Sequence, residues 1–312
     1  MSHNDVACAG PIIVGVERSK ASRDALALAR ALARAAGTRL ILVTVYPIDA
    51  RSAAMEQGAY ARALAEEAES TLEWMARPLA GVLAESRAVP CTSVARGIQE
   101  LAAAEDALAI VVGPSHRGPI GRIVPGSVSA RLLHGATCPV AVAPRGYWGA
   151  AYAGIRQIGV GYVGAPEAGE ALGAAVGLAA RTGAAVRVLS VVEPAAITAA
   201  VPQGLGYAER EEFARVDLTH SLRHVIDRAA TPVEISGEVI DGDADEELAR
   251  LSGEVDLLVC GSRGRGPIGS VMLGSVSTGV LRKARGPVLV VPRGARDGFA
   301  TLRAPAKGAA AS

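Results

Sequence analysis

Residues 261–294 read GSRGRGPIGSVMLGSVSTGVLRKARGPVLVVPRG, and residues 113–146 read GPSHRGPIGRIVPGSVSARLLHGATCPVAVAPRG. The two stretches align without a gap at an offset of 148 residues, and 18 of their 34 positions are identical. A period this long indicates a duplicated domain, because the units of solenoid proteins run to about 20–50 residues. The sequence therefore predicts two similar domains in this chain of 312 residues.

The repeat and the composition around it define the expected domain boundaries. We expect a first domain over 1–146, a linker over 147–154, a second domain over 155–294 and a tail over 295–312. The linker is rich in Gly and Ala. The tail has little to bury, so we expect it to be disordered.

Short apolar runs alternate with amphipathic segments in each half of the chain. In the first half the expected strands are Pro11–Val16, Leu40–Val45, Pro90–Ala95, Leu108–Gly113 and Pro139–Ala143. The expected helices there are Ser19–Ala36, with Ser22 as N-cap and Gly37 as the stop, then Glu56–Leu79, Ile98–Ala104 and Ser127–His134. In the second half the expected strands are Gln157–Tyr162, Ala185–Val192, Val233–Ile240, Leu257–Gly261 and Val288–Val291, and the expected helices are Glu167–Arg181, Tyr207–Arg228, Asp243–Leu251 and Ser275–Lys283. Apolar strands that alternate with helices predict an α/β fold of two tandem doubly wound domains, each a parallel sheet flanked by helices.

The composition excludes several classes of function. The formal net charge is +1 and aromatic residues make up 3% of the chain, which argues against nucleic acid as a partner. No apolar run reaches the roughly 18 residues that span a bilayer, so we expect no membrane association. The first ten residues lack a charged region followed by an apolar core, so we expect no secretion signal, and none of the four cysteines forms a C-x-x-C pair. The sequence indicates a reduced, cytoplasmic protein.

The repeated stretch in the second half has the features of a phosphate-binding loop. Gly261 ends a strand, Gly264 follows three residues later, and the Gly274-Ser275 step opens a helix. Glycines let backbone amides approach a phosphate, and a helix N-terminus adds partial positive charge. Arg263 and Arg265 could supply full charges. The alternative interpretation is a surface turn, rich in glycine, before a capped helix.

Other motifs in the chain lack the sequence context that a dinucleotide, nucleoside triphosphate or metal site requires. Gly264, Gly266 and Gly269 match G-x-G-x-x-G, but this fingerprint belongs in the first strand–helix turn and here follows the fourth strand. No G-x-x-x-x-G-K-[ST] exists, which excludes a P-loop NTPase. His220 and His224 lie four apart on a helix without a third ligand, so we expect no metal site. Asp243 and Glu246 are interpreted as a capping box.

At these residues the chain resembles a known family. GSRGRGPIGSVMLGSVSTGVLRKARGPVLVVPRG is similar to the C-terminal signature of the universal stress protein family, in its ATP-binding subgroup. The openings IIVGVERSKASRDALALARALA and IGVGYVGAPEAGEALGAAVGLAA resemble the first strand and helix of that family. The resemblance implies a tandem universal stress protein whose domains each have a five-stranded parallel sheet of order 3-2-1-4-5.

The resemblance also implies a set of nucleotide-binding residues in each half. In the second half these are Gly261, Gly264, Gly274, Ser275, Val276 and Ser277, with Cys260 before the loop, Val191 near the adenine, and Arg263 and Arg265 in the loop. In the first half they are Gly113, Gly126, Ser127, Val128 and Ser129, with Glu17 and Val45. The implied ligand is ATP, with or without Mg²⁺.

The second half departs from the family pattern at one of these positions and the first half at two. The family usually has Asp at the end of the first strand, where the second half has Val163 and the first half has Glu17. The second loop glycine is replaced in the first half by His116, whose imidazole could crowd the phosphate path or pair with it. We expect the second half to hold the better phosphate cradle.

These features together predict a stress-response regulatory protein that binds ATP or a related adenine nucleotide. The alternatives are an interaction or scaffold module whose degenerate loops bind nothing, and a weak ATPase. No general base is evident near the loop, so we do not predict an efficient enzyme. The resemblance further implies pairing of the last strands of the two domains within the chain, a homodimer, and a regulatory protein partner that the sequence does not identify.

Overall fold

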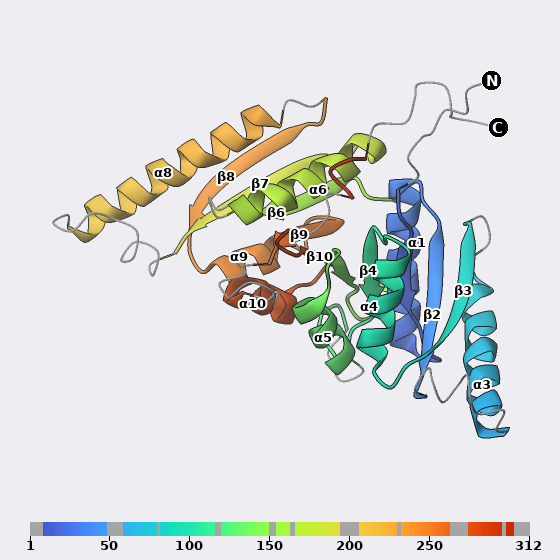
Figure 1. Cartoon of the computed structure of the whole chain (residues 1–312). Coiled ribbons are helices and arrows are strands. Elements are labelled where there is room, and N and C mark those ends of the chain that lie inside the picture. Colours follow the sequence, from blue (N-terminus) through green and yellow to red (C-terminus); the bar gives the residue numbers. More distant parts are fainter. Residues whose placement is uncertain are drawn as a thin grey trace, which may run out of the picture. The chain divides into compact units, whose positions relative to one another are not determined.

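The structure, a computed structural model, describes residues 9–48, 59–79, 82–115, 120–149, 154–162, 166–193, 206–229, 232–262, 274–294 and 298–302 (Figure 1). The chain divides into two compact units. Unit 1 comprises Met1–Ala153 and Gly294–Gly298, and unit 2 comprises Gly154–Arg293 and Phe299–Ser312.

Each unit contains a five-stranded parallel sheet. In unit 1 the strands are β1 (Ile12–Gly15), β2 (Leu40–Tyr46), β3 (Ala84–Pro90), β4 (Ala109–Val112) and β5 (Val140–Val142), in the order β3-β2-β1-β4-β5. In unit 2 they are β6 (Gln157–Gly161), β7 (Ala185–Val192), β8 (Ile235–Asp241), β9 (Leu257–Gly261) and β10 (Val288–Val291), in the order β8-β7-β6-β9-β10. The predicted α/β class and the order 3-2-1-4-5 are confirmed in both units.

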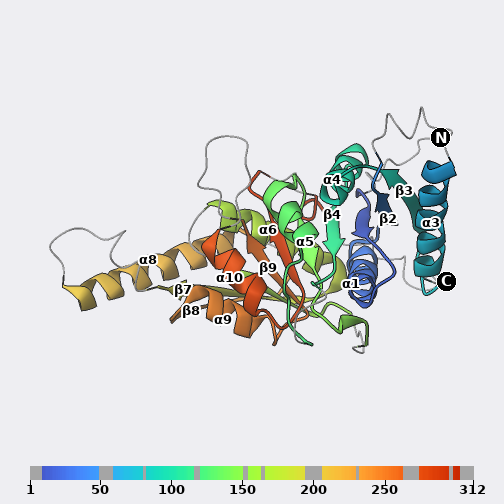
Figure 2. The same cartoon turned by 90° about the horizontal axis from the view of Figure 1, so that it is seen from below.

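Helices cover both faces of each sheet. In unit 1 they are α1 (Lys20–Ala36), α3 (Ala59–Ala76), α4 (Val94–Ala104) and α5 (Ser127–Gly135), and a short 3-10 turn, η1 (Tyr147–Gly149), follows β5. In unit 2 they are α6 (Pro166–Thr182), α8 (Tyr207–Arg228), α9 (Ala244–Leu251) and α10 (Ser275–Lys283). Figure 2 shows α1 and α4 on opposite sides of the unit 1 sheet, and both contact β1 and β4. This arrangement places the carboxyl ends of β1 and β4 at one edge, where crossovers in opposite directions leave a crevice.

The third strand of unit 1 lies six residues earlier than predicted. The sequence analysis expected Pro90–Ala95, whereas β3 is Ala84–Pro90 and α4 already begins at Val94. β3 is an edge strand, paired only with β2 among the described strands, and its side chains are mostly exposed or half-buried. An edge strand needs no continuous apolar run, so the apolar signal that found the central strands was absent here.

Two predicted helix caps differ from the observed ones. The N-cap of α1 is Ser19, whose hydroxyl accepts a hydrogen bond from the Ser22 amide at 3.1 Å, rather than Ser22 itself. Gly37 ends the helix in the left-handed conformation, with φ of 65°, as predicted. Asp243 is the N-cap of α9, but its side chain makes no capping hydrogen bond, so the predicted capping box is wrong.

A buried carboxylate ties η1 to α1 in unit 1. Asp24 is 3% exposed, and its two carboxylate oxygens accept hydrogen bonds from the Gly146 and Trp148 amides, each at 2.8 Å. A buried carboxylate is tolerated when backbone donors satisfy both oxygens. The chain that leaves β5 is therefore held against α1.

Part of the tail expected to be disordered is packed against unit 2. Residues 298–302 form a turn in which Phe299 is 1% exposed and Leu302 is 8% exposed. A Cβ at Gly177 of α6 would lie 1.9 Å from the Phe299 carbonyl oxygen, so the turn approaches the helix backbone at a glycine. The expectation of disorder is wrong for these five residues because one aromatic side chain supplies the apolar area that the Ala- and Gly-rich remainder lacks.

Replacing Gly177 by Ala is expected to release this turn. The new Cβ would overlap the Phe299 carbonyl, and we expect a loss of about 2 kcal/mol in the free energy of unfolding. Gly169, on the same helix, has no atom within 4 Å of its ideal Cβ. Gly169→Ala is the matched control and should raise stability by about 0.5–1 kcal/mol through helix propensity. Denaturant unfolding of both variants measures the difference, and equal effects would contradict the packing role of Phe299.

Candidate functional site

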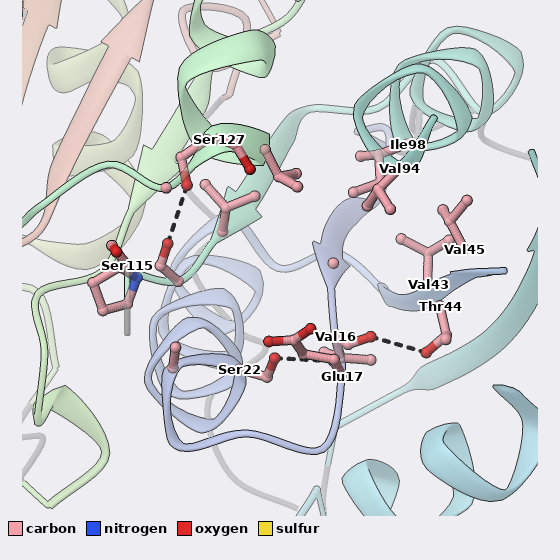
Figure 3. Close-up of a pocket in the computed structure, with 18 residues that line it drawn as sticks. Val16, Glu17, Ser22, Val43, Thr44, Val45, Val94, Ile98, Ser115 and Ser127 are labelled. Carbon is pink, nitrogen blue, oxygen red and sulfur yellow. Dashed lines mark hydrogen bonds between the residues drawn. The ribbon is translucent and has the colours of Figure 1, made fainter. Parts of the chain in front are cut away.

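A cavity of about 370 Å³ lies at the carboxyl ends of the unit 1 strands (Figure 3). Its lining comes from the ends of β1, β2 and β4 and from the first turns of α1, α4 and α5. All seven residues that were assigned to a nucleotide site in this half line it: Glu17, Val45, Gly113, Gly126, Ser127, Val128 and Ser129. The structure thus brings together side chains from four separate segments of the sequence.

The first turn of α5 forms one wall of the cavity. Gly126 is the N-cap, with φ of −79° and ψ of 176°, and as a glycine it has no side chain that could cap the helix. The amides of the first turn of a helix have no acceptor within that helix, and the helix dipole makes this end partially positive. This wall therefore presents the backbone amides of a helix start to the cavity, next to the hydroxyls of Ser115 and Ser127 (Figure 3).

An apolar slot forms the opposite part of the cavity. Figure 3 shows Val94 and Ile98 of α4 facing Val43 and Val45 of β2. A Cβ at Gly15 would lie 2.9 Å from the Ile98 side chain, so the glycine at the end of β1 lets α4 approach the sheet. Branched side chains on two sides suit a flat apolar ring.

Glu17 lies between these two regions. Its amide donates a hydrogen bond to the Ser22 hydroxyl at 2.9 Å, which fixes the turn from β1 into α1. The neighbouring hydroxyl of Thr44 donates to the Val16 carbonyl at 3.0 Å. Glu17 is the one ionisable side chain among the described lining residues. The middle of the cavity thus carries a carboxylate acceptor for hydroxyl or amino groups of a ligand.

Two of the predicted phosphate-contacting residues have a structural role. The hydroxyl of Ser129, in α5, donates to the Gly113 carbonyl at 3.2 Å, and the hydroxyl of Ser277, in α10, donates to the Gly261 carbonyl at 2.9 Å. Both serines are buried. In each unit this hydrogen bond joins the start of the helix to the end of the preceding strand.

Gly113 also has a packing role. A Cβ at this position would lie 2.3 Å from the Ala21 carbonyl oxygen, far inside normal contact. The backbone of β4 therefore passes the first turn of α1 where only a glycine fits. The close packing of strand on helix therefore requires a glycine at position 113 even without a ligand.

The corresponding residues of unit 2 are described in part. Gly261 ends β9, Gly274 is the N-cap of α10, and Ser275 is the first residue of that helix. Val276 is half-buried in the same turn. Arg263, Gly264 and Arg265 lie outside the described residues, as do Val163 and His116. The prediction that the second half holds the better phosphate cradle therefore stays a prediction.

Cys260 and Val191 occupy buried positions of the unit 2 sheet. Val191 is in β7 and Cys260 in β9, and both are buried. Burial raises the pKa of the Cys260 thiol to about 12. At neutral pH the side chain is an uncharged thiol, which fits packing rather than nucleophilic chemistry.

The sequence analysis missed the apolar slot. Val94 and Ile98 line it, but the third strand was placed over the start of α4, which assigned Val94 to the wrong element. The amphipathic pattern of α4 was the available signal. Thr44, Ser22 and Ser115 also line the cavity and carry no motif of their own.

The described residues contain neither a metal-binding cluster nor a helix that could cross a membrane. They contain no group of three or more His, Cys, Asp and Glu side chains placed for a metal ion. Across the same described ranges, no helix has both the length and the apolar character that crossing a bilayer requires.

Comparison with known proteins places both units in one family. The model of the Universal stress protein family matches residues 9–144 and 154–292. A universal stress protein of Mycobacterium tuberculosis is 32% identical over 181 residues, which cover 58% of this chain and 60% of that relative. One of Mycolicibacterium smegmatis is 33% identical over 200 residues, covering 64% of this chain and 66% of the relative. The crystal structure of a universal stress protein from Archaeoglobus fulgidus shares the fold, with a TM-score of 0.67 at 20% identity over 92% of this chain and 99% of that one.

Proposed function

Because this chain belongs to the universal stress protein family, we propose that it is a stress-response regulatory protein that binds ATP or a related adenine nucleotide. The observation that carries the proposal is the composition of the unit 1 cavity. Along its length it offers an apolar slot, a carboxylate and the N-terminus of α5, whose N-cap is a glycine. These three features complement a base, a ribose and a phosphate in that order.

The base would lie in the slot between α4 and β2, against Val45 and Ile98. The Glu17 carboxylate would accept hydrogen bonds from ribose hydroxyls, because it is the one carboxylate among the described lining residues. The phosphates would accept from the amides of Ser127 and Val128. Any Mg²⁺ would enter with the triphosphate. We propose regulation rather than hydrolysis, since no second carboxylate among the described lining residues could activate a water.

The loop of unit 2 is proposed as a second site of the same kind. Support comes from its sequence, G-x-x-G-x9-G-S, and from the start of α10. Like α5, this helix has a glycine as its N-cap, which has no side chain that could cap it. Gly274 has φ of −67° and ψ of 163°, close to the conformation of Gly126. The two halves thus present similar helix starts.

Replacing Glu17 by Gln is the direct test of the unit 1 site. Loss of the charge-assisted hydrogen bonds to the ribose should weaken adenosine, AMP and ATP by a similar factor of about ten, since such bonds contribute about 1.5–3 kcal/mol when intact. Isothermal titration calorimetry measures all three ligands. Glu66→Gln, which removes an exposed carboxylate from α3, is the matched control and should change nothing.

The outcome also separates the proposal from its alternatives. If no adenine compound gave heat or raised the melting temperature of the purified chain, the scaffold interpretation would replace the proposal. If ATP bound but Glu17→Gln and Glu66→Gln bound it equally well, nucleotide binding would stand and the unit 1 site would be wrong. Steady release of ADP would favour the ATPase interpretation.

A further inference from the structure

A second hollow of unit 1 lies between α1, α3 and η1, away from the nucleotide cavity. Its volume is about 410 Å³. Leu26 and Met75, both almost completely buried, form its floor, and Trp74 and Trp148 line it. These are the two tryptophans of the whole chain. A chain in which aromatic residues make up only 3% has thus placed both indoles at one site.

The walls of this hollow are fixed by contacts within unit 1. The Trp148 amide donates to the buried carboxylate of Asp24 at 2.8 Å, which holds η1 against α1. The guanidinium carbon of Arg23 lies 4.5 Å from the centroid of the Trp74 ring, within the range of a cation–π interaction. The Trp74 indole and the backbone of η1 are therefore positioned before any ligand arrives, which lowers the entropic cost of binding.

The charge at the rim has one sign. Arg23 and Arg77 line the hollow, and no acidic residue is among its described lining residues. Within the described part of the chain, neither guanidinium lies within salt-bridge distance of a carboxylate. Two guanidinium groups beside two indoles complement a ligand with an anionic group on a planar apolar ring.

We propose that this hollow is a binding site for a small aromatic carboxylate. The ring lies against the indoles of Trp74 and Trp148 over the floor formed by Leu26 and Met75. The carboxylate accepts hydrogen bonds from Arg77, with Arg23 contributing charge while it stays on Trp74. The site is separate from the nucleotide cavity and does not depend on the proposed function.

Tryptophan emission provides a readout of this site alone, because both tryptophans line it. Benzoate is the probe. Benzamide lacks the charge, cyclohexanecarboxylate lacks the aromatic ring, and inorganic phosphate carries charge without a ring, so each compound tests one requirement of the site. We expect saturable quenching or a spectral shift with benzoate, and at least tenfold weaker binding of the other three. Trp74→Phe and Trp148→Phe each leave one indole, and the remaining indole should respond in both.

The charge requirement is tested by two arginine variants. Arg77→Gln should weaken benzoate at least tenfold, and Arg62→Gln, at an exposed position elsewhere on α3, should leave it unchanged. Neither should alter ATP affinity. The proposal is overturned if benzoate gives no saturable change in emission, or if phosphate or benzamide binds as tightly as benzoate. It is also overturned if Arg77→Gln and Arg62→Gln have the same affinity for benzoate.

Discussion

Replacing Gly126 by Asp is expected to remove nucleotide binding from unit 1 without destabilising the protein. At its φ of −79° and ψ of 176° any residue is allowed, and the nearest heavy atom to an added Cβ is Ser115 Cα, at 3.8 Å. An Asp at an N-cap accepts hydrogen bonds from first-turn amides and interacts favourably with the helix dipole. The ligand-free variant should be as stable as the parent chain, or a few tenths of a kcal/mol more stable.

The same substitution removes the donors that the phosphate needs. The new carboxylate occupies the amides of α5 and places a negative charge beside the phosphate. Loss of two charge-assisted hydrogen bonds, each worth about 1.5–3 kcal/mol, corresponds to a decrease in affinity of about 100-fold or more. Calorimetry with ATP measures the affinity and thermal unfolding measures the stability. Gly126→Ala, which adds the Cβ without the charge, should bind nearly as well as the parent.

The matched substitution in unit 2 identifies the occupied half. Gly274 is the N-cap of α10 in nearly the same conformation, so Gly274→Asp should act on the second site as Gly126→Asp acts on the first. If ATP binding survives in one single variant and is lost in the other, the half that lost it is the nucleotide site. Unchanged binding in the double variant would show that neither helix start holds the phosphates.

Strands whose residues are mostly buried could be predicted, because burial on both faces requires apolar side chains. β7, β9 and β10 have the predicted bounds. β9 and β10 form continuous apolar runs, and β7 is mostly apolar, with Arg187 and Ser190 as its polar residues. The exposed strand β3 could not be placed as well. In β3 the polar residues Glu85, Ser86 and Arg87 interrupt the apolar residues, because one edge and part of a face of this strand are exposed to solvent.

The candidate site divides in the same way. The repeat and the glycine–serine step predicted the start of α5 correctly, because a Gly-Ser step is typical of a helix N-terminus that can bind an anion. The apolar slot remained hidden, since Val43 and Ile98 become neighbours only through the packing of α4 on the sheet. Phe299 was missed for a similar reason, because its partner Gly177 is far away in the sequence.

Gly113 and Gly126 provide a test of which glycines of the motif are required for packing. The sequence motif assigns both to phosphate binding, whereas the structure gives Gly113 a packing contact and leaves room for a Cβ at Gly126. Gly113→Ala should lower the free energy of unfolding of unit 1 by about 3 kcal/mol, since its Cβ would lie 2.3 Å from the Ala21 carbonyl oxygen and 2.7 Å from the carbon. For a domain of this size that loss corresponds to a decrease of about 6–12 °C in melting temperature. Gly126→Ala should stay within about 0.5 kcal/mol of the parent chain.

Nucleotide affinity separates the packing role of Gly113 from a binding role. Well below its melting temperature, folded Gly113→Ala should bind ATP within a few-fold of the parent, because the strain lies between β4 and α1 rather than at the phosphates. A variant that kept its unfolding free energy and lost its ATP affinity would instead make Gly113 a ligand contact. In that case the close approach of β4 to Ala21 would not be what requires a glycine there.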